Sequence, residues 1–235
     1  MFVEGKGHPT WERYAAPRDE FIELIRSLDD EQLTTRVPMC PSWTVLDVAR
    51  HVCGLNAELV AGVSGRLGSD EATARQVTDR AAASASDVCD EWLGYGPDME
   101  AICTTEPLWA TRLGADLVVH LHDVRHALGL AIRRDDDATI AAAHQYVDVF
   151  QQRVGEISKV GITVELTDGF RRPADPALPD SGVVLQTTPY DFLRSYTGRR
   201  SRRQVEQLDW RGDPSSILDE AWSPYGPFQH DDVAD

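Results

Sequence analysis

Hydrophobic residues recur at intervals of three and four positions through the first two-thirds of the chain. Phe21, Leu24, Ile25 and Leu28 show this spacing near the N-terminus. Such spacing places apolar side chains along one face of an α-helix. The same pattern returns further along and predicts five long helices, over residues 10–33, 44–63, 71–93, 107–130 and 138–157.

Proline, glycine and capping residues mark where several of these helices begin and end. Two prolines interrupt the segment RVPMCPSW, residues 36–43. Thr44 and Asp47 then have the spacing of a capping box, in which a hydroxyl and a carboxylate each satisfy a backbone N–H at a helix start. Pro107 suits the first turn of the fourth helix and Gly129 suits its end.

After about residue 160 the sequence becomes typical of strands. Residues 161–168 (GITVELTD) and 182–188 (GVVLQTT) are short and rich in β-branched side chains. Later residues alternate, with a helical pattern over 189–198, a strand-like one over 205–212 and a helical one over 214–222. We therefore predict a helical domain over residues 1–157 and a small α+β domain over residues 158–235.

Composition limits the classes of partner. The 235 residues carry a net charge of −16, which repels phosphate backbones and anionic lipids, so we expect neither nucleic acid nor membranes as partners. No apolar run approaches the ~18 residues of a spanning helix, and the N-terminus has no apolar signal-peptide core. The four cysteines form no CxxC pair, which favours a cytoplasmic protein with reduced thiols.

The segment DLVVHLHDVRH, from Asp116 to His126, concentrates candidate metal ligands in the fourth helix. Residues three and four apart share a helix face, so one grouping joins Asp116, His120 and Asp123. The other joins His122 and His126 around Asp123 and imitates the HExxH pattern of zinc proteases. Because this helix is apolar nearly all round, periodicity leaves both groupings open.

A site of either kind needs a further ligand from another element, and the second helix offers His51. This histidine lies between Val48 and Leu55 at helical spacing, so it faces the bundle interior, whereas Arg50 points away. Zinc takes imidazole and carboxylate ligands readily. A histidine that faces the interior of a bundle is also typical of a hydrogen-bonded core residue, which composition alone favours, and the spacing leaves both roles open.

Several segments resemble the mycothiol-dependent maleylpyruvate isomerase branch of the DinB-like superfamily. PSWTVLDVARHVCGL is similar to its second-helix signature, and DLVVHLHD to its fourth-helix signature of an acidic residue, three apolar residues, His, two residues and Asp. YDFLRSYTGRR followed by VEQLDWRGD resembles the sterol-carrier-like α+β domain at the C-terminus of that branch. The resemblance covers nearly the whole chain in the same order.

This resemblance implies an N-terminal four-helix bundle that holds a metal between helices, and the ligand types favour zinc among the divalent metals. It carries the three metal ligands onto His51, Asp116 and His120, and gives Asp123 a structural or ligand-orienting role. The family usually has Glu where this chain has Asp116. Since Asp is one methylene shorter, the metal would lie closer to the fourth helix, bind through a water or bind weakly.

The resemblance also implies mycothiol as thiol cosubstrate and a small electrophile as substrate. A metal can deprotonate a thiol that coordinates it, and the thiolate would add reversibly to a double bond or displace a leaving group. The glycine-arginine pair of the family's C-terminal domain falls on Gly198 and Arg199. We therefore predict Arg199 as a catalytic residue and Arg200 and Trp43 as substrate-binding residues, the other interpretations being a solvated basic run and a tryptophan packed into the core.

Two other classes of function stay open at this point. A metal-dependent hydrolase on the same bundle would use metal-bound hydroxide as its nucleophile and need no thiol. A non-catalytic binding or stress protein would keep the fold without the chemistry, and the shorter Asp116 keeps that alternative open. The sequence contains neither a conventional Ser-His-Asp arrangement nor a glycine-rich phosphate motif.

Overall fold

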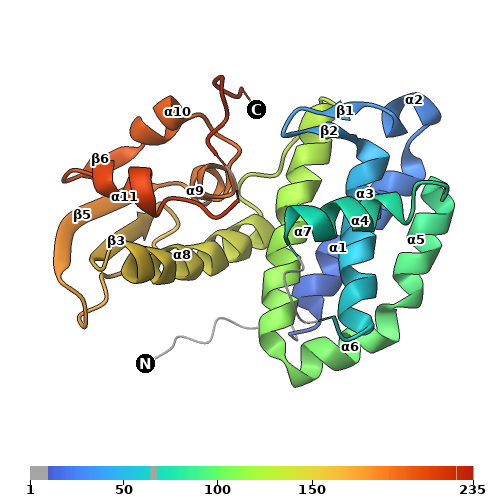
Figure 1. Ribbon diagram of the computed structural model, residues 1–235, viewed down its shortest axis with the longest axis horizontal. Helices are drawn as coiled ribbons and strands as arrows, with labels where there is room; N and C mark the ends of the chain where they lie inside the picture. The colour runs from blue at the N-terminus through green and yellow to red at the C-terminus, as the bar shows by residue number, and fades with distance from the viewer. Residues whose placement is uncertain (1–9, 64–67, 226, 235) are drawn as a thin grey trace. The chain divides into compact units, whose positions relative to one another are not determined.

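The computed structural model describes residues 10–63, 68–225 and 227–234. The chain divides into two compact units, Met1–Ile132 and Arg133–Asp235, shown in Figure 1. The first unit is helical apart from one short hairpin, and the second combines helices with a four-stranded sheet. The predicted class, a helical bundle followed by an α+β part, is confirmed.

Four helices of the N-terminal unit form a closed bundle. They are α1 (Glu12–Ser27), α3 (Val45–Val60), α5 (Ala85–Gly94) and α7 (Pro107–Ala127). Helix α1 contacts α5 and α7, and α3 contacts the same two helices, as Figure 1 shows. Their inward faces carry an apolar core that includes Phe21, Ile25, Val48, Val52, Trp92, Leu113, Leu117 and Val124.

A polar network joins three of these helices inside that core. The Tyr14 hydroxyl donates to Asn56 Oδ1 at 2.6 Å and accepts from Trp92 Nε1 at 2.9 Å. Asn56 Nδ2 donates to the Val52 carbonyl at 2.7 Å. Since a buried polar group is costly unless it is paired, these bonds fix the register of α1, α3 and α5. Burial also raises the pKa of Tyr14, which keeps it a neutral donor.

The start of α3 follows from its local sequence. The proline-rich segment before it forms a hairpin of β1 (Arg36–Val37) and β2 (Cys40–Thr44). Thr44 then accepts from the Asp47 amide at 3.2 Å, and the Asp47 carboxylate accepts from the Thr44 amide at 3.0 Å. This confirms the predicted capping box. It sets the helical phase that turns His51 inward.

The prediction of a single third helix over residues 71–93 is wrong. The structure has α4 (Asp70–Thr78) and then α5, separated by residues 79–84. Ser84 and Asp87 form another capping box, which starts a new helix because it supplies partners for the backbone N–H groups of the first turn, which have no partner within the helix. Helix α4 lies across α3 (Figure 1), and α6 (Gly96–Thr105) leads to α7.

The C-terminal unit is built on a mixed sheet in the order β4-β3-β5-β6. Strand β3 (Gly161–Leu166) pairs in parallel with β5 (Asp180–Thr187) and antiparallel with β4 (Arg171–Arg172), and β6 (Asp209–Arg211) pairs antiparallel with β5. Helices α8 (Asp137–Ile157) and α9 (Pro189–Tyr196) contact each other, and α8 contacts β3. Helices α10 (Arg202–Glu206) and α11 (Ser215–Glu220) complete the unit.

Two sequence predictions differ from the second unit as observed. Residues 205–206 end α10 and not a strand, since Ser201 and Gln204 form a capping box that starts this short helix. Helix α8 belongs to the second unit, so the division falls at residues 132/133, while the sequence predicts it at 157/158. The reason is an aromatic cluster in which Phe150 of α8 packs against Tyr196 and Trp222, with ring centroids 5.4 and 5.1 Å away.

In the part of the chain that the structure describes, no helix is both long and apolar enough to cross a bilayer.

Candidate metal centre

Two buried histidines and an aspartate converge inside the helical bundle. His51 on α3 and Asp116 and His120 on α7 each offer a ligand atom, and these atoms lie within 4.8 Å of one another. His51 and His120 are 7% and 6% exposed. Among the described residues, these three form the one group of histidine, cysteine and acidic side chains whose ligand atoms lie close enough together to hold a metal ion. Tertiary structure thus joins the first of the two groupings that periodicity left open.

The donor set fits a divalent metal. Two imidazole nitrogens and one carboxylate oxygen are ligands that zinc accepts, and ligand atoms around tetrahedral zinc lie about 3.4 Å apart. His120 Nε2 and Asp116 Oδ1 are 3.8 Å apart. The Asp116 side chain is 30% exposed and the His120 side chain 8%. The carboxylate therefore lies on the solvent side of the cluster, while both rings are embedded in the bundle.

Asp123 lies next to His120, on the side of the ring opposite Asp116. The two residues are one helical turn apart on α7, and His120 Nδ1 lies 3.5 Å from Asp123 Oδ2. That separation is longer than an ordinary hydrogen bond and within reach of an ion pair. Asp123 is fully buried. The predicted ligand-orienting role of Asp123 fits this position, since the carboxylate faces the ring nitrogen on the side away from Asp116.

Trp43 and His51 are neighbours. The ring centroids of Trp43 and His51 are 5.0 Å apart. Those of His51 and His120 are 5.1 Å apart, and these two rings meet nearly edge to face. Trp43 is half-buried and packs against the apolar core. Its packing agrees with a tryptophan at the edge of the core, and its predicted contact with a substrate stays a prediction.

The competing histidines lie outside the cluster. His122 is 3% exposed and His126 is half-buried, and neither joins His51 in the described structure. On a helix, position 122 is rotated about 160° from position 120 after two steps of about 100°. The HDxxH pattern in α7 is therefore not a second set of ligands around His51.

Sequence reasoning did not identify Gln76, which contacts His51 directly. His51 Nδ1 lies 2.8 Å from Gln76 Oε1, and Gln76 Nε2 donates to Glu58 Oε2 at 2.7 Å. Glu58 also accepts from Arg75 Nη2 at 2.5 Å. Gln76 is 1% exposed. Glu58 lies seven residues after His51 and thus on the same helix face, a spacing from which the sequence could have indicated an extended polar group.

The protein's own buried cysteines are poor nucleophiles. Burial raises the pKa of Cys53 to about 12 and that of Cys103 to about 11, and it also raises the pKa of Cys89. The first of these thiols lies beside an ion pair in which Arg80 contacts Glu91 at 2.5 and 3.0 Å. Since these three thiols stay protonated at neutral pH, none of them is a ready thiolate nucleophile.

The predicted arginines lie in the C-terminal unit. Arg200 is 7% exposed and its guanidinium lies 5.9 Å from the Tyr190 ring centroid, while Arg199 is half-buried and donates to the Thr197 carbonyl at 2.5 Å. Both arginines are less exposed to solvent than the residues of a solvated basic run would be. Their predicted contacts with a substrate remain predictions.

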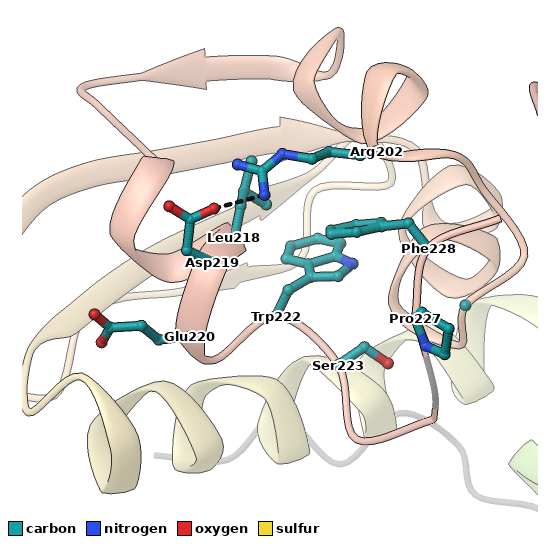
Figure 2. A pocket seen from close by; sticks show the side chains of 9 residues that line it. Arg202, Leu218, Asp219, Glu220, Trp222, Ser223, Pro227 and Phe228 are labelled. Carbon is teal, nitrogen blue, oxygen red and sulfur yellow. Dashed lines mark ion pairs between the residues drawn. The ribbon is translucent and has the colours of Figure 1, made fainter. Parts of the chain in front are cut away.

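A pocket of about 320 Å³ lies nearby in the same unit (Figure 2). Trp222 and Phe228 form its aromatic side, and Arg202 bridges to Asp219 at 2.5 Å across it. Of the described residues that line it, Gly198 precedes the predicted pair, but neither Arg199 nor Arg200 is among them.

The fold and the cluster define a helical-bundle protein with a candidate metal centre. Residues 14–111 match the family model described as the mycothiol maleylpyruvate isomerase N-terminal domain. This part of the chain, which holds Trp43 and His51, matches the domain that the resemblance predicted. The match ends within α7 before Asp116 and His120, so the acidic residue and the second histidine rest on the geometry alone.

Two solved structures are similar to the chain. One is a crystal structure of the mycothiol-dependent maleylpyruvate isomerase, with a TM-score of 0.46, and the other is of a histidine-to-alanine mutant of that enzyme, with a TM-score of 0.47. Each shares 16% sequence identity and covers 82% of this chain and 90% of its own. A likeness this slight assigns neither ligand nor activity. No curated protein matches the chain.

Proposed function

We propose that the protein is a metal- and thiol-dependent enzyme that uses mycothiol to isomerise, or to transfer sulfur to, a small electrophile. The observation that carries this proposal is the convergence of His51, Asp116 and His120 within 4.8 Å. The family of residues 14–111 supports mycothiol as the thiol. Burial raises the pKa of three of the protein's own cysteines, which makes them poor nucleophiles and supports a thiol from solution.

The three side chains would hold a divalent metal, for which we propose zinc. Two neutral imidazoles and one carboxylate leave a site of net positive charge with open coordination positions, the arrangement of catalytic zinc sites. When bound, the metal supplies the positive charge that lowers the pKa of a coordinating thiol. Asp116, the more exposed ligand, would face the solvent side from which a thiol enters.

The two reactions diverge after the thiolate attacks. In isomerisation, sulfur forms a bond to one carbon of a double bond, the remaining single bond rotates, and loss of the same thiolate restores the double bond. In transfer, the new carbon–sulfur bond stays and a leaving group departs with its electron pair. Arg199 and Arg200 are the residues we propose to contact a carboxylate of the substrate or the thiol.

Metal analysis of the purified full-length protein tests the ligand assignment. We expect about one zinc ion per chain, lost in both His51→Ala and His120→Ala. His126→Ala is the matched control, because it removes an imidazole from the same helix outside the cluster, and it should retain the metal. Loss of metal in the control but not in His51→Ala would overturn the ligand set.

Activity assays separate the three classes of function. In the presence of mycothiol, we expect the zinc-loaded protein either to isomerise maleylpyruvate-like electrophiles without net loss of the thiol or to consume mycothiol with alkylating electrophiles. The two ligand variants should lose this activity. Hydrolysis that persists without thiol would indicate the metal-dependent hydrolase instead. A protein that binds no metal would favour the non-catalytic alternative.

A further inference from the structure

A chain of hydrogen bonds leads from the surface of the bundle to His51. It begins at Arg75, passes through Glu58 and Gln76, and ends on Nδ1 of the histidine. His51 and Glu58 lie on α3, whereas Arg75 and Gln76 lie on α4. The Glu58 side chain is 14% exposed and Gln76 is 1% exposed, so the two central members are shielded from competing water.

The donors and acceptors along this chain have only one consistent order. An ionised carboxylate only accepts, so Glu58 must face the amide NH₂ of Gln76, and its pairing with the Arg75 guanidinium suits that charge. The Gln76 amide oxygen then faces His51 Nδ1 at 2.8 Å. Because that oxygen also only accepts, Nδ1 carries the ring proton. The lone pair of a neutral His51 is therefore on Nε2.

Packing of α4 on α3 depends on Gly54. A Cβ atom at this position would lie 2.6 Å from Gln76 Cβ and 2.9 Å from its Cγ. Real Cβ atoms do not approach this closely, so any other residue would displace α4 or the Gln76 side chain. The glycine one turn after His51 thus allows the amide to reach the imidazole.

We propose that Gln76 is a positioning residue for the metal centre. Held by Glu58, its amide oxygen fixes the His51 tautomer and turns Nε2 toward Asp116 and His120. This inference rests on the proposed function, because Nε2 of His51 is the atom that would bind the proposed metal. His51 thus has a neutral amide oxygen at hydrogen-bond distance from Nδ1, whereas Nδ1 of His120 lies 3.5 Å from the buried Asp123 carboxylate.

The tautomer can be measured without any metal or activity. Long-range ¹H–¹⁵N correlation spectra of the full-length, metal-free protein at pH 8 distinguish Nδ1–H from Nε2–H in each histidine ring. We expect the Nδ1–H form for His51, assigned by its loss in His51→Ala. In Gln76→Leu, which removes the acceptor at similar volume, we expect the two tautomers to mix. A wild-type His51 in the Nε2–H form would overturn the proposal.

Metal affinity supplies the second measurement. Competition between the protein and a chromophoric chelator for Zn²⁺ should show affinity roughly ten- to a hundredfold weaker in Gln76→Leu, the usual effect of losing a partner of a metal ligand. Gln152→Leu, the same change at an exposed position of α8, should bind Zn²⁺ like the wild type. Unchanged affinity in a Gln76→Leu protein of native circular dichroism would contradict the proposal.

A charge exchange keeps the test valid if Gln76→Leu does not fold. Gln76→Glu alone sets two carboxylates against each other and should weaken Zn²⁺ binding. Adding Glu58→Gln restores a donor for the new carboxylate, which can still accept from Nδ1, so both the Nδ1–H tautomer and Zn²⁺ affinity should recover. A folded double variant that lacks the Nδ1–H tautomer, or that binds Zn²⁺ as weakly as Gln76→Glu, would contradict the proposal. An ordered tautomer in a protein that binds no Zn²⁺ would instead refute the proposed function alone.

Discussion

At the scale of single residues, the strength of the centre depends most on Asp116. Its carboxylate is the ligand group nearest to solvent, and its Oδ1 lies 3.8 Å from His120 Nε2. The resemblance noted from the sequence implies the longer Glu at this position. The structure brings the shorter side chain within the same cluster as both histidines, so the missing methylene has not removed the carboxylate from the site.

Lengthening this side chain should be tolerated. We expect Asp116→Glu to bind Zn²⁺ at least as tightly as the wild type, because the carboxylate sits at the open side of the cluster, where an extra methylene meets little resistance. Asp116→Ala should bind Zn²⁺ at least tenfold more weakly without loss of fold, since it removes a ligand and not a core contact. Titration with Zn²⁺ measures both. Unchanged binding in Asp116→Ala would remove this residue from the site.

At the scale of elements, the position of α7 depends on its close approach to α1. A Cβ atom at Gly114 would lie 2.2 Å from the Arg13 carbonyl oxygen and 3.0 Å from its carbon. These are main-chain atoms, which cannot move aside as a side chain can. Because Gly114 is two residues before Asp116, the same contact sets how far the ligand-bearing face of α7 stands from the other helices.

This contact predicts an unusual effect of alanine. In a helix interior, glycine is normally about 1 kcal/mol worse than alanine. At Gly114 the clash should dominate, and we expect Gly114→Ala to lower the free energy of unfolding by about 1–3 kcal/mol. Gly94→Ala is the control, because a Cβ there meets no atom within 4 Å, and it should leave stability unchanged or slightly increased. Urea denaturation followed by circular dichroism measures both variants.

At the scale of the whole molecule, α8 decides where one unit ends and the next begins. Its buried face carries Val147, Phe150 and Val154, each fully buried. Phe150 packs on aromatic rings of the C-terminal unit, while all three candidate ligands lie before residue 133. The helix is therefore part of the second core, although its periodicity is the same as that of the bundle helices.

Two fragments test this division. We expect residues 1–132 to unfold cooperatively and to bind Zn²⁺, since they contain the four bundle helices and the cluster. Residues 1–157 should bind an apolar dye more strongly and associate, because they leave the apolar face of α8 without its partners. Thermal unfolding, dye fluorescence and gel filtration give the comparison. A stable 1–157 fragment beside an unfolded 1–132 fragment would place the boundary at residue 157.

The sequence by itself determined the features that depend on neighbours along the chain. The capping box of Thr44 and Asp47, the helical phase of His51 and the shared face of Asp116 and His120 all follow from spacings of three or four residues, which a helix converts directly into contacts. The change from helical to strand-like pattern after residue 160 is local in the same sense.

Tertiary structure decided what depends on residues far apart. Periodicity could not choose between His120 and His122 because α7 is apolar on nearly every side, and the choice came from which face meets His51 on α3. Gln76 reaches His51 across 25 positions, through a helix pairing that needs Gly54. Helix α8 belongs to the second unit because its Phe150 packs on Tyr196 and Trp222. In each case the deciding free energy comes from burial between segments, which no local pattern encodes.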